Sequence, residues 1–190
     1  SHASRRIFAA VGAWDGIAAW RVSPFRDMRV WDAAGFGSIH VDSAAMGESS
    51  LGWIIENRVI QSALLERARQ LPTVELLCPA ALDTVEALEN GRWRARLRDG
   101  RELTTRLLVG ADGAESKVRE MAGIKTSGWN YGQHAVVANV RTAEPHQATA
   151  WQRFLPTGPL AFLPLADGRC SIVWATTPER AGALLALDES

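Results

Sequence analysis

The chain has 190 residues, 47% of them hydrophobic and 22% charged, which is typical of a folded domain and excludes collagen-like, low-complexity and wholly disordered chains. Its 21 Lys and Arg residues balance its 21 Asp and Glu residues, which argues against a nucleic-acid partner and against a polybasic membrane patch. No apolar run reaches the length of about 18 residues that a transmembrane helix needs, so no transmembrane segment is predicted.

The two cysteines, Cys78 and Cys170, stand far apart and form no CxxC pair. Neither they nor the four scattered histidines have metal-ligand spacing, so no metal site is predicted. We expect two reduced, packed thiols in a cytoplasmic protein. The first three residues, Ser-His-Ala, resemble a vector remnant and are set aside from the fold prediction.

The first 72 residues are predicted to form a helix, a pair of strands and a longer helix. Apolar spacings of three and four predict a helix over residues 7–20. Short strands are predicted at 28–31 and 38–41, the second with alternating residues, and a glycine-bearing turn lies between them. The clearest helix covers 54–71, where an apolar stripe ends at Pro72.

The next fifty residues are predicted to be mainly β. Strands are expected at 74–77 and 82–88, followed by a hairpin over 93–105 with an Asp-Gly turn. A buried strand is predicted over 106–111, around the run Leu-Leu-Val, and it leads through a glycine turn into a helix near Glu115. A strand, a glycine turn and a helix form the layout of a ligand-binding crossover in α/β proteins.

The last third of the chain is predicted to be an antiparallel sheet, followed by a helix over 178–187. Its strands are expected at 136–140, 150–154, 160–163 and 170–174. The order of elements predicts a mixed α/β chain with two interleaved domains, between which the chain crosses twice.

The turn before the predicted helix at Glu115 is the strongest candidate site. Gly110 and Gly113 permit close backbone approach to a ligand, and the helix start offers free amides to a phosphate. Asp112 can accept from a ribose hydroxyl or from a backbone amide, and Arg119 can pair with Asp112 or with a phosphate. The alternative is an Asp-Gly turn that caps a helix, with Arg119 on the solvated face. Ser116 is expected to be a cap rather than a nucleophile.

This run resembles the DG motif of the flavin-dependent aromatic hydroxylases, the para-hydroxybenzoate-hydroxylase-like group. Along nearly the whole chain, the sequence is similar to ubiquinone-biosynthesis hydroxylases of the UbiH, UbiF and VisC type. The residues that carry the resemblance are 30–32, 52–57, 110–113 with Ser116 and Arg119, 129–131, 135–138, 151–156, 158–165 and 171–174.

The resemblance implies an internal fragment of the para-hydroxybenzoate-hydroxylase-like FAD/NAD(P)-binding fold, with an antiparallel substrate-domain sheet and part of the FAD domain. Residues 1–53 and 123–190 would belong to the substrate domain and residues 54–122 to the FAD domain. The family's Gly-x-Gly-x-x-Gly unit and later Gly-Asp motif are missing from this chain. We therefore expect a piece of a protein about twice as long, inactive by itself.

The resemblance also assigns site residues. It places Asp112 and Gly113 near the FAD ribose and pyrophosphate and near the route of NADPH, and gives Arg119 the role of holding the motif in place. Asn57 opens the long helix where relatives carry an Arg or Gln that touches the flavin, although Asn is shorter. Candidate substrate-pocket residues are Trp151, Phe154, Leu160, Phe162 and Trp174. The alternative for each of these five is ordinary sheet core.

The implied function of the parent protein is NAD(P)H- and O2-dependent hydroxylation of the aromatic ring of a polyprenyl phenol in ubiquinone biosynthesis. Implied partners are members of a ubiquinone-biosynthesis complex, with peripheral association at the inner membrane. Two alternatives stay open: an aromatic hydroxylase of the same architecture that acts on a soluble phenol, and a non-catalytic assembly module. The apparent lack of a charged anchor among the sheet residues favours the polyprenyl substrate.

Overall fold

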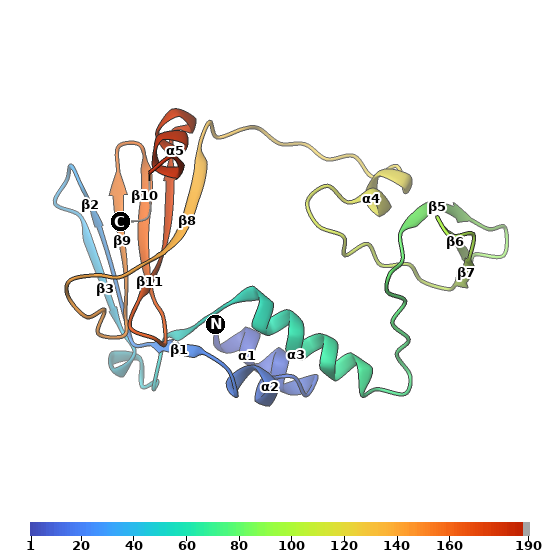
Figure 1. The fold of residues 1–190 in the computed structure, drawn as a ribbon, viewed down its shortest axis with the longest axis horizontal. Helices are drawn as coiled ribbons and strands as arrows, with labels where there is room; N and C mark the ends of the chain where they lie inside the picture. The colour runs from blue at the N-terminus through green and yellow to red at the C-terminus, as the bar shows by residue number, and fades with distance from the viewer. Residues whose placement is uncertain (188–190) are drawn as a thin grey trace. The chain divides into compact units, whose positions relative to one another are not determined.

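The structure is a computed structural model that describes residues 1–187. It contains two compact units (Figure 1). The first combines Ser1–Val74 with Asn130–Ser190, and the second is Glu75–Trp129. The long helix, which the sequence assigned to the FAD segment, groups with the sheet of the first unit. The assignment of chain segments to named domains stays a prediction.

The first unit holds most of the regular structure. Its elements are α1 (His2–Ala10), α2 (Trp14–Ala18), β1 (Val22–Phe25), β2 (Asp27–Asp32), β3 (Ser38–Asp42), the 3-10 helix η1 (Ala44–Met46), β4 (Gly52–Ile55), α3 (Asn57–Arg69), β8 (His134–Val140), β9 (Thr149–Leu155), β10 (Gly158–Pro164), β11 (Cys170–Thr176) and α5 (Pro178–Leu185). The second unit contains β5 (Leu82–Ala87), β6 (Trp93–Leu97), β7 (Glu102–Thr105) and α4 (Lys117–Met121).

The predicted N-terminal helix is two helices. Gly12 lies between them with φ +75°, a left-handed conformation that glycine adopts without strain, so α1 ends there and α2 starts in a new direction. The exclusion of the first three residues is also wrong. Ser1 caps α1 by accepting from the amide of Ser4, and His2 makes a 2.7 Å hydrogen bond to the carbonyl of Ser50.

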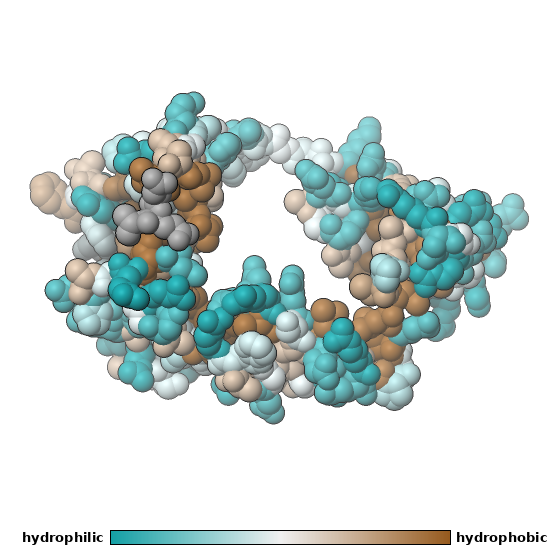
Figure 2. Space-filling view, in the orientation of Figure 1, coloured by the Kyte–Doolittle hydropathy of each residue, from teal (hydrophilic) through white to brown (hydrophobic). Residues whose placement is uncertain are grey.

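A six-stranded sheet forms the body of the first unit, with strand order β3-β2-β9-β10-β11-β8. All neighbours are antiparallel except β2 and β9, which run parallel. The predicted strands over residues 136–174 are therefore confirmed, and β9, β10 and β11 form a meander (Figure 1). Figure 2 shows hydrophobic surface over the β8 side of this sheet. Val137, a residue of β8, is 63% exposed.

In the second unit, the predicted hairpin is confirmed as β6 and β7, and β5 adds a third antiparallel strand. The strands predicted at 74–77 and 106–111 are wrong, since neither segment is regular in the structure. Leu107 is 73% exposed, and its backbone carbonyl accepts from the Thr105 hydroxyl at 2.8 Å instead of from a neighbouring strand. An apolar run forms a strand only where a second strand takes its backbone hydrogen bonds.

The cysteines differ in environment. Cys170 is buried at the start of β11, and this burial raises the pKa of its thiol. Cys78 is exposed, so the expectation that both thiols are packed is wrong for Cys78. Both are free thiols in the structure.

Replacing Gly158 at the start of β10 is expected to destabilise the sheet. Gly158 has φ +137°, and a Cβ there would overlap the carbonyl oxygen of Ala175 on β11. We expect Gly158→Ala to lower the free energy of unfolding by roughly 2–4 kcal/mol, measured by chemical denaturation. The matched control is Gly168→Ala, which has φ +86° but open space around the new methyl group and should cost about 1 kcal/mol. Equal losses for the two variants would contradict the close approach to Ala175.

Candidate functional site: the turn before α4 and one face of the sheet

The turn before α4 is organised by the carboxylate of Asp112. This carboxylate accepts the hydroxyl of Ser116, the backbone amide of Lys117 at 2.8 Å and that of Val118 at 3.2 Å. The Ser116 hydroxyl oxygen in turn accepts from the amide of Arg119 at 3.1 Å, so the predicted cap at Ser116 is confirmed. Asp112 and Ser116 together satisfy the first three amides of α4.

This arrangement corrects two expectations about ligand binding. The amides at the start of α4 are bonded to the chain itself, so the prediction that they are free for a phosphate is wrong. Gly110 does permit a close approach, but to Val118: a Cβ on Gly110 would lie 3.0 Å from the Val118 side chain. The turn thus has the geometry of the alternative that the sequence left open, an Asp-Gly turn that caps a helix.

The Arg119 side chain forms a hydrogen bond to the backbone of this turn and does not pair with Asp112. Its Nη2 donates to the carbonyl of Ala114 at 2.8 Å. The guanidinium therefore ties the residue after Gly113 to the body of α4. The role that the resemblance implies for Arg119, holding the motif in place, stays a prediction.

Gly113 is the part of the turn that fits a cofactor. It has φ +93°, and no heavy atom lies within 4 Å of the position that a Cβ would take. Gly113 and Arg119 border a hollow of about 540 Å3 that also contains Trp93, Leu108 and Ile124. An open glycine backbone, a nearby cation and apolar walls fit the nucleotide portion of FAD.

Hydrogen bonding keeps Asp112 ionised. The pKa of its carboxyl lies below the ordinary value of 3.8, first because the Ser116 hydroxyl donates to it and also because the amides of Val118 and Lys117 do. Partial desolvation opposes this shift and is outweighed. The carboxylate is therefore charged throughout the neutral range and acts as an acceptor only.

Asn57, the other candidate flavin contact, lies in the first unit. It is the exposed first residue of α3 and follows Glu56, the N-cap residue. Glu56 forms ion pairs with Arg21 at 3.0 Å and with Arg58 at 2.6 Å. The start of α3 thus carries a cluster of charged side chains.

Four of the five substrate-pocket candidates share one face of the sheet. Phe162 lies opposite Trp151, and Leu160 lies opposite Trp174, and directly opposed residues of paired strands project to the same side. All four of these side chains are half-buried. Phe154 is opposite Pro159, which places it on the other face, where it is 45% exposed. Strand alternation therefore separates Phe154 from the other four.

The shared face also carries charge, which the sequence analysis missed. The Arg29 guanidinium lies 5.4 Å from the centre of the Trp151 ring, and Trp31 packs edge-on against the same ring at 6.2 Å. Arg153 is on this face too, because it lies opposite Leu160. The expected lack of a charged anchor is wrong, so it no longer favours a lipid over a soluble phenol. Arg29 and Trp31 are two residues apart in the predicted strand at 28–31, a spacing that puts them on one face, but only the β2–β9 pairing brings them to Trp151.

Comparisons with known proteins define the family. A model described as an FAD binding domain matches residues 6–183, and the chain belongs to this family of FAD-binding domains. The resemblance found in the sequence is confirmed by curated relatives. The chain is 40% identical over 195 residues to the mitochondrial ubiquinone biosynthesis monooxygenase COQ6 of Xenopus tropicalis, covering 98% of this chain and 42% of the relative. It is 36% identical over 188 residues to the 3-demethoxyubiquinol 3-hydroxylase of Escherichia coli, covering 95% of this chain and 46% of the relative.

The fold is shared with flavin-dependent monooxygenases. A crystal structure of Pseudomonas aeruginosa PqsL in complex with 2-aminobenzoylacetate superposes with a TM-score of 0.79 at 22% identity, covering 96% of this chain and 50% of that one. The predicted para-hydroxybenzoate-hydroxylase-like fold is thereby confirmed. The chain spans less than half the length of the curated relatives it matches.

Residues 1–187 contain neither a candidate metal centre nor a candidate membrane-spanning helix. No group of three or more His, Cys, Asp or Glu side chains in this part of the chain is placed to hold a metal ion. No helix within it is long and apolar enough to cross a membrane.

The Asp112 cap should give α4 a characteristic pH dependence. Because the folded-state pKa of Asp112 is depressed, its stabilising effect is complete above the ordinary value of 3.8 and is lost as the pH falls through the folded-state pKa. Hydrogen exchange at the amides of Lys117 and Val118 should therefore accelerate, relative to the intrinsic rate, only below about pH 3.8. In Asp112→Asn this transition should disappear. A transition of equal size in that variant would assign it to another group.

Proposed function

We propose that the parent protein hydroxylates the aromatic ring of a polyprenyl phenol or quinol intermediate in ubiquinone biosynthesis. The observation that carries this proposal is the 40% identity, sustained over 98% of the chain, to a ubiquinone biosynthesis monooxygenase. The similarity to a bacterial 3-demethoxyubiquinol 3-hydroxylase supports the same reaction class. The overall reaction inserts one oxygen atom of O2 into a ring C–H bond and releases the other as water, with NAD(P)H supplying the two electrons.

In this proposal, FAD is held partly by residues of this chain. Gly113 leaves its backbone open to the nucleotide, Arg119 supplies a nearby cation, and Asn57 lies at the exposed start of α3. Asp112 does not contact FAD in this proposal. Its carboxylate holds the turn in which Gly113 lies. When bound, FAD supplies the electron transfer and O2 activation that amino-acid side chains cannot.

The substrate would lie against the shared face of the sheet. Trp151, Leu160, Phe162 and Trp174 offer an apolar wall for an aromatic ring and the first part of a prenyl chain. Such a wall excludes water from the reacting ring. The guanidinium groups of Arg29 and Arg153 provide hydrogen-bond donors for the oxygen substituents of that ring.

The proposed function also implies where the parent protein works and with which partners. We infer that the parent works with other members of a ubiquinone-biosynthesis complex, peripheral to the inner membrane, where its prenylated substrate resides. The mitochondrial relative from Xenopus tropicalis supports this setting. We expect the 190-residue chain alone to turn nothing over, because the Asp112 carboxylate and the first amides of α4 are already bonded to each other and are not available to a flavin.

Complementation tests the proposed reaction. The parent protein is expressed in Escherichia coli lacking its own 3-demethoxyubiquinol 3-hydroxylase, and extracted quinones are measured by mass spectrometry. We expect ubiquinone to reappear and the demethoxy precursor to fall. A purified parent that contains flavin and hydroxylates only soluble phenols would replace the proposal by the first alternative. A parent that binds no flavin would replace it by an assembly module.

A pair of neighbouring variants tests the sheet face. Phe162 faces the proposed substrate, whereas Leu163 on the same strand faces the opposite side, and both are half-buried. We expect Phe162→Ala to raise the KM for the prenylated substrate about tenfold or more, since burying an aromatic side chain contributes roughly 1.5–3 kcal/mol. Leu163→Ala is the control for lost stability and should leave KM within about twofold. A larger change in KM for Leu163→Ala would move the substrate to the other face.

A further inference from the structure

The loop between β8 and β9 contains an unusual stretch of backbone. Gln147 and Ala148 have φ values of 54° and 53°, the left-handed conformation that residues other than glycine seldom adopt. Two such residues in succession persist only where surrounding contacts hold them. Here the carbonyl of Ala148 accepts from the amide of Arg26 at 2.8 Å, and the amide of Thr149 donates to the carbonyl of His146 at 2.9 Å.

His146 holds this loop with one ring nitrogen and reaches a different turn with the other. Its Nδ1 lies 3.0 Å from the amide nitrogen of Ala148, and its Nε2 lies 3.0 Å from the carbonyl oxygen of Leu165. An amide can only donate and a carbonyl can only accept. The two partners therefore require a neutral imidazole with its proton on Nε2. The half-buried His146 ring links the loop before β9 to the turn between β10 and β11.

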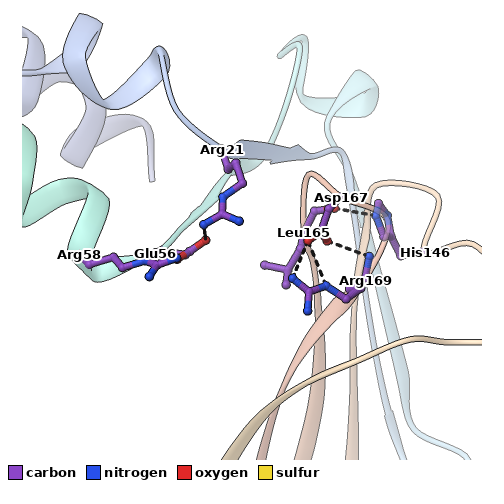
Figure 3. A network of polar contacts seen from close by, with 7 residues as sticks. All are labelled: Arg21, Glu56, Arg58, His146, Leu165, Asp167 and Arg169. Atoms are coloured by element: carbon purple, nitrogen blue, oxygen red, sulfur yellow. Dashed lines mark hydrogen bonds and ion pairs between the residues drawn. The ribbon is translucent and has the colours of Figure 1, made fainter.

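The turn that His146 holds is built around a charge pair. The amide of Leu165 donates to the carbonyl of Arg169 at 2.9 Å, and the carbonyl of Leu165 also accepts from the amide of Gly168 at 3.2 Å. The Asp167 carboxylate accepts from the Arg169 guanidinium at 2.7 Å, and this contact lowers the pKa of Asp167. Figure 3 shows His146, Leu165, Asp167 and Arg169 as one connected group.

This turn faces the start of α3. Leu165, Asp167 and Arg169 border, together with Arg21 and Glu56, a small pocket of about 20 Å3 (Figure 3). After the dominant effect of Asp167, the carboxylate of Glu56 also raises the pKa of Arg169, as expected for charges that lie close together. Glu56 immediately precedes Asn57, the candidate flavin contact. The turn therefore lies where the substrate sheet meets the helix that begins at Asn57.

We propose that His146 is a positioning residue, whose Nε2–H holds the carbonyl of Leu165 and thereby fixes the turn over 165–169 beside the start of α3. This inference rests on the proposed function, because it assigns the turn the task of setting the sheet, and the ring lying on it, relative to the flavin helix. A displacement of about 1 Å between reacting groups can reduce a catalytic rate about a hundredfold. The hydrogen bond to Leu165 is thus expected to affect kcat more than KM.

Two conservative variants separate the two contacts of His146. Asn can accept from the amide two residues ahead, as in an Asx turn, but it is too short to reach Leu165. Gln can extend an amide donor toward Leu165 without accepting from Ala148 in the same way. His146→Asn thus keeps the loop contact, and His146→Gln keeps the contact with the turn. Both are made in the full-length parent protein with bound FAD.

The readouts are steady-state kinetics with the prenylated substrate and peptide-level hydrogen exchange. For His146→Asn we expect kcat to fall about tenfold or more, KM to change less than about threefold, and exchange to accelerate over 165–169. For His146→Gln we expect at least a third of the wild-type kcat and an unchanged exchange rate over 165–169. Unchanged kcat in His146→Asn, or equal losses in both variants with exchange altered only over 146–149, would overturn the inference and leave His146 a purely local structural role.

Failure of the proposed function gives a different pattern. If wild-type parent protein does not hydroxylate the prenylated substrate, the proposed reaction is wrong. Hydrogen exchange in the two variants then still decides whether His146 holds the turn over 165–169. Acceleration there in His146→Asn alone would support the contact, and its absence would overturn it.

Discussion

The pairing register of β9, β10 and β11 is the constraint on which the proposed substrate face depends. Side chains alternate between the two faces of a sheet, so a slip of one residue would carry every apolar candidate to the other side. Gly158, at the start of β10, comes so close to the backbone of Ala175 on β11 that no side chain would fit there. With this register, Trp151, Phe162 and Trp174 share a face and Phe154 does not.

In the turn before α4, some residues cap the helix and Gly113 borders the hollow proposed to receive a ligand. Asp112 and Ser116 consume the first amides of α4, so the polar groups that look most suited to a phosphate are already paired within the chain. Gly113, one residue on, has an open backbone beside the hollow that Arg119 borders. The helix cap formed by Asp112 and Ser116 limits the movement of the turn. It therefore holds the backbone of Gly113 in a fixed position for a ligand.

Charged side chains gather where the turn between β10 and β11 lies beside the start of α3. Glu56 is shared between Arg21 and Arg58, and the turn between β10 and β11 brings Asp167 and Arg169 to the same place. Exposed ion pairs of this kind contribute little to stability. The contact that reaches this turn from another loop is the hydrogen bond between His146 Nε2 and the carbonyl of Leu165, which agrees with a role for His146 in geometry rather than in stability.

The sequence by itself determined the family and most of the elements. Alternation and apolar spacing located β2, β3, α3 and the meander, and the Asp-Gly turn located the hairpin of the second unit, because these signals depend on local backbone preferences and on burial of one face. The spacing of Asp112 and Ser116 was also sufficient to anticipate a helix cap.

Only the tertiary structure decided the rest. The run at 107–109 is apolar enough for a strand, but a strand requires a hydrogen-bonded neighbour, which local sequence cannot supply. Arg29 joins Trp151 through a parallel pairing of strands that lie more than a hundred residues apart. The hydrogen bond between His146 and Leu165 likewise joins the loop before β9 to the turn between β10 and β11. These two segments meet only when the sheet has formed, so no pattern of neighbouring residues could have predicted the contact.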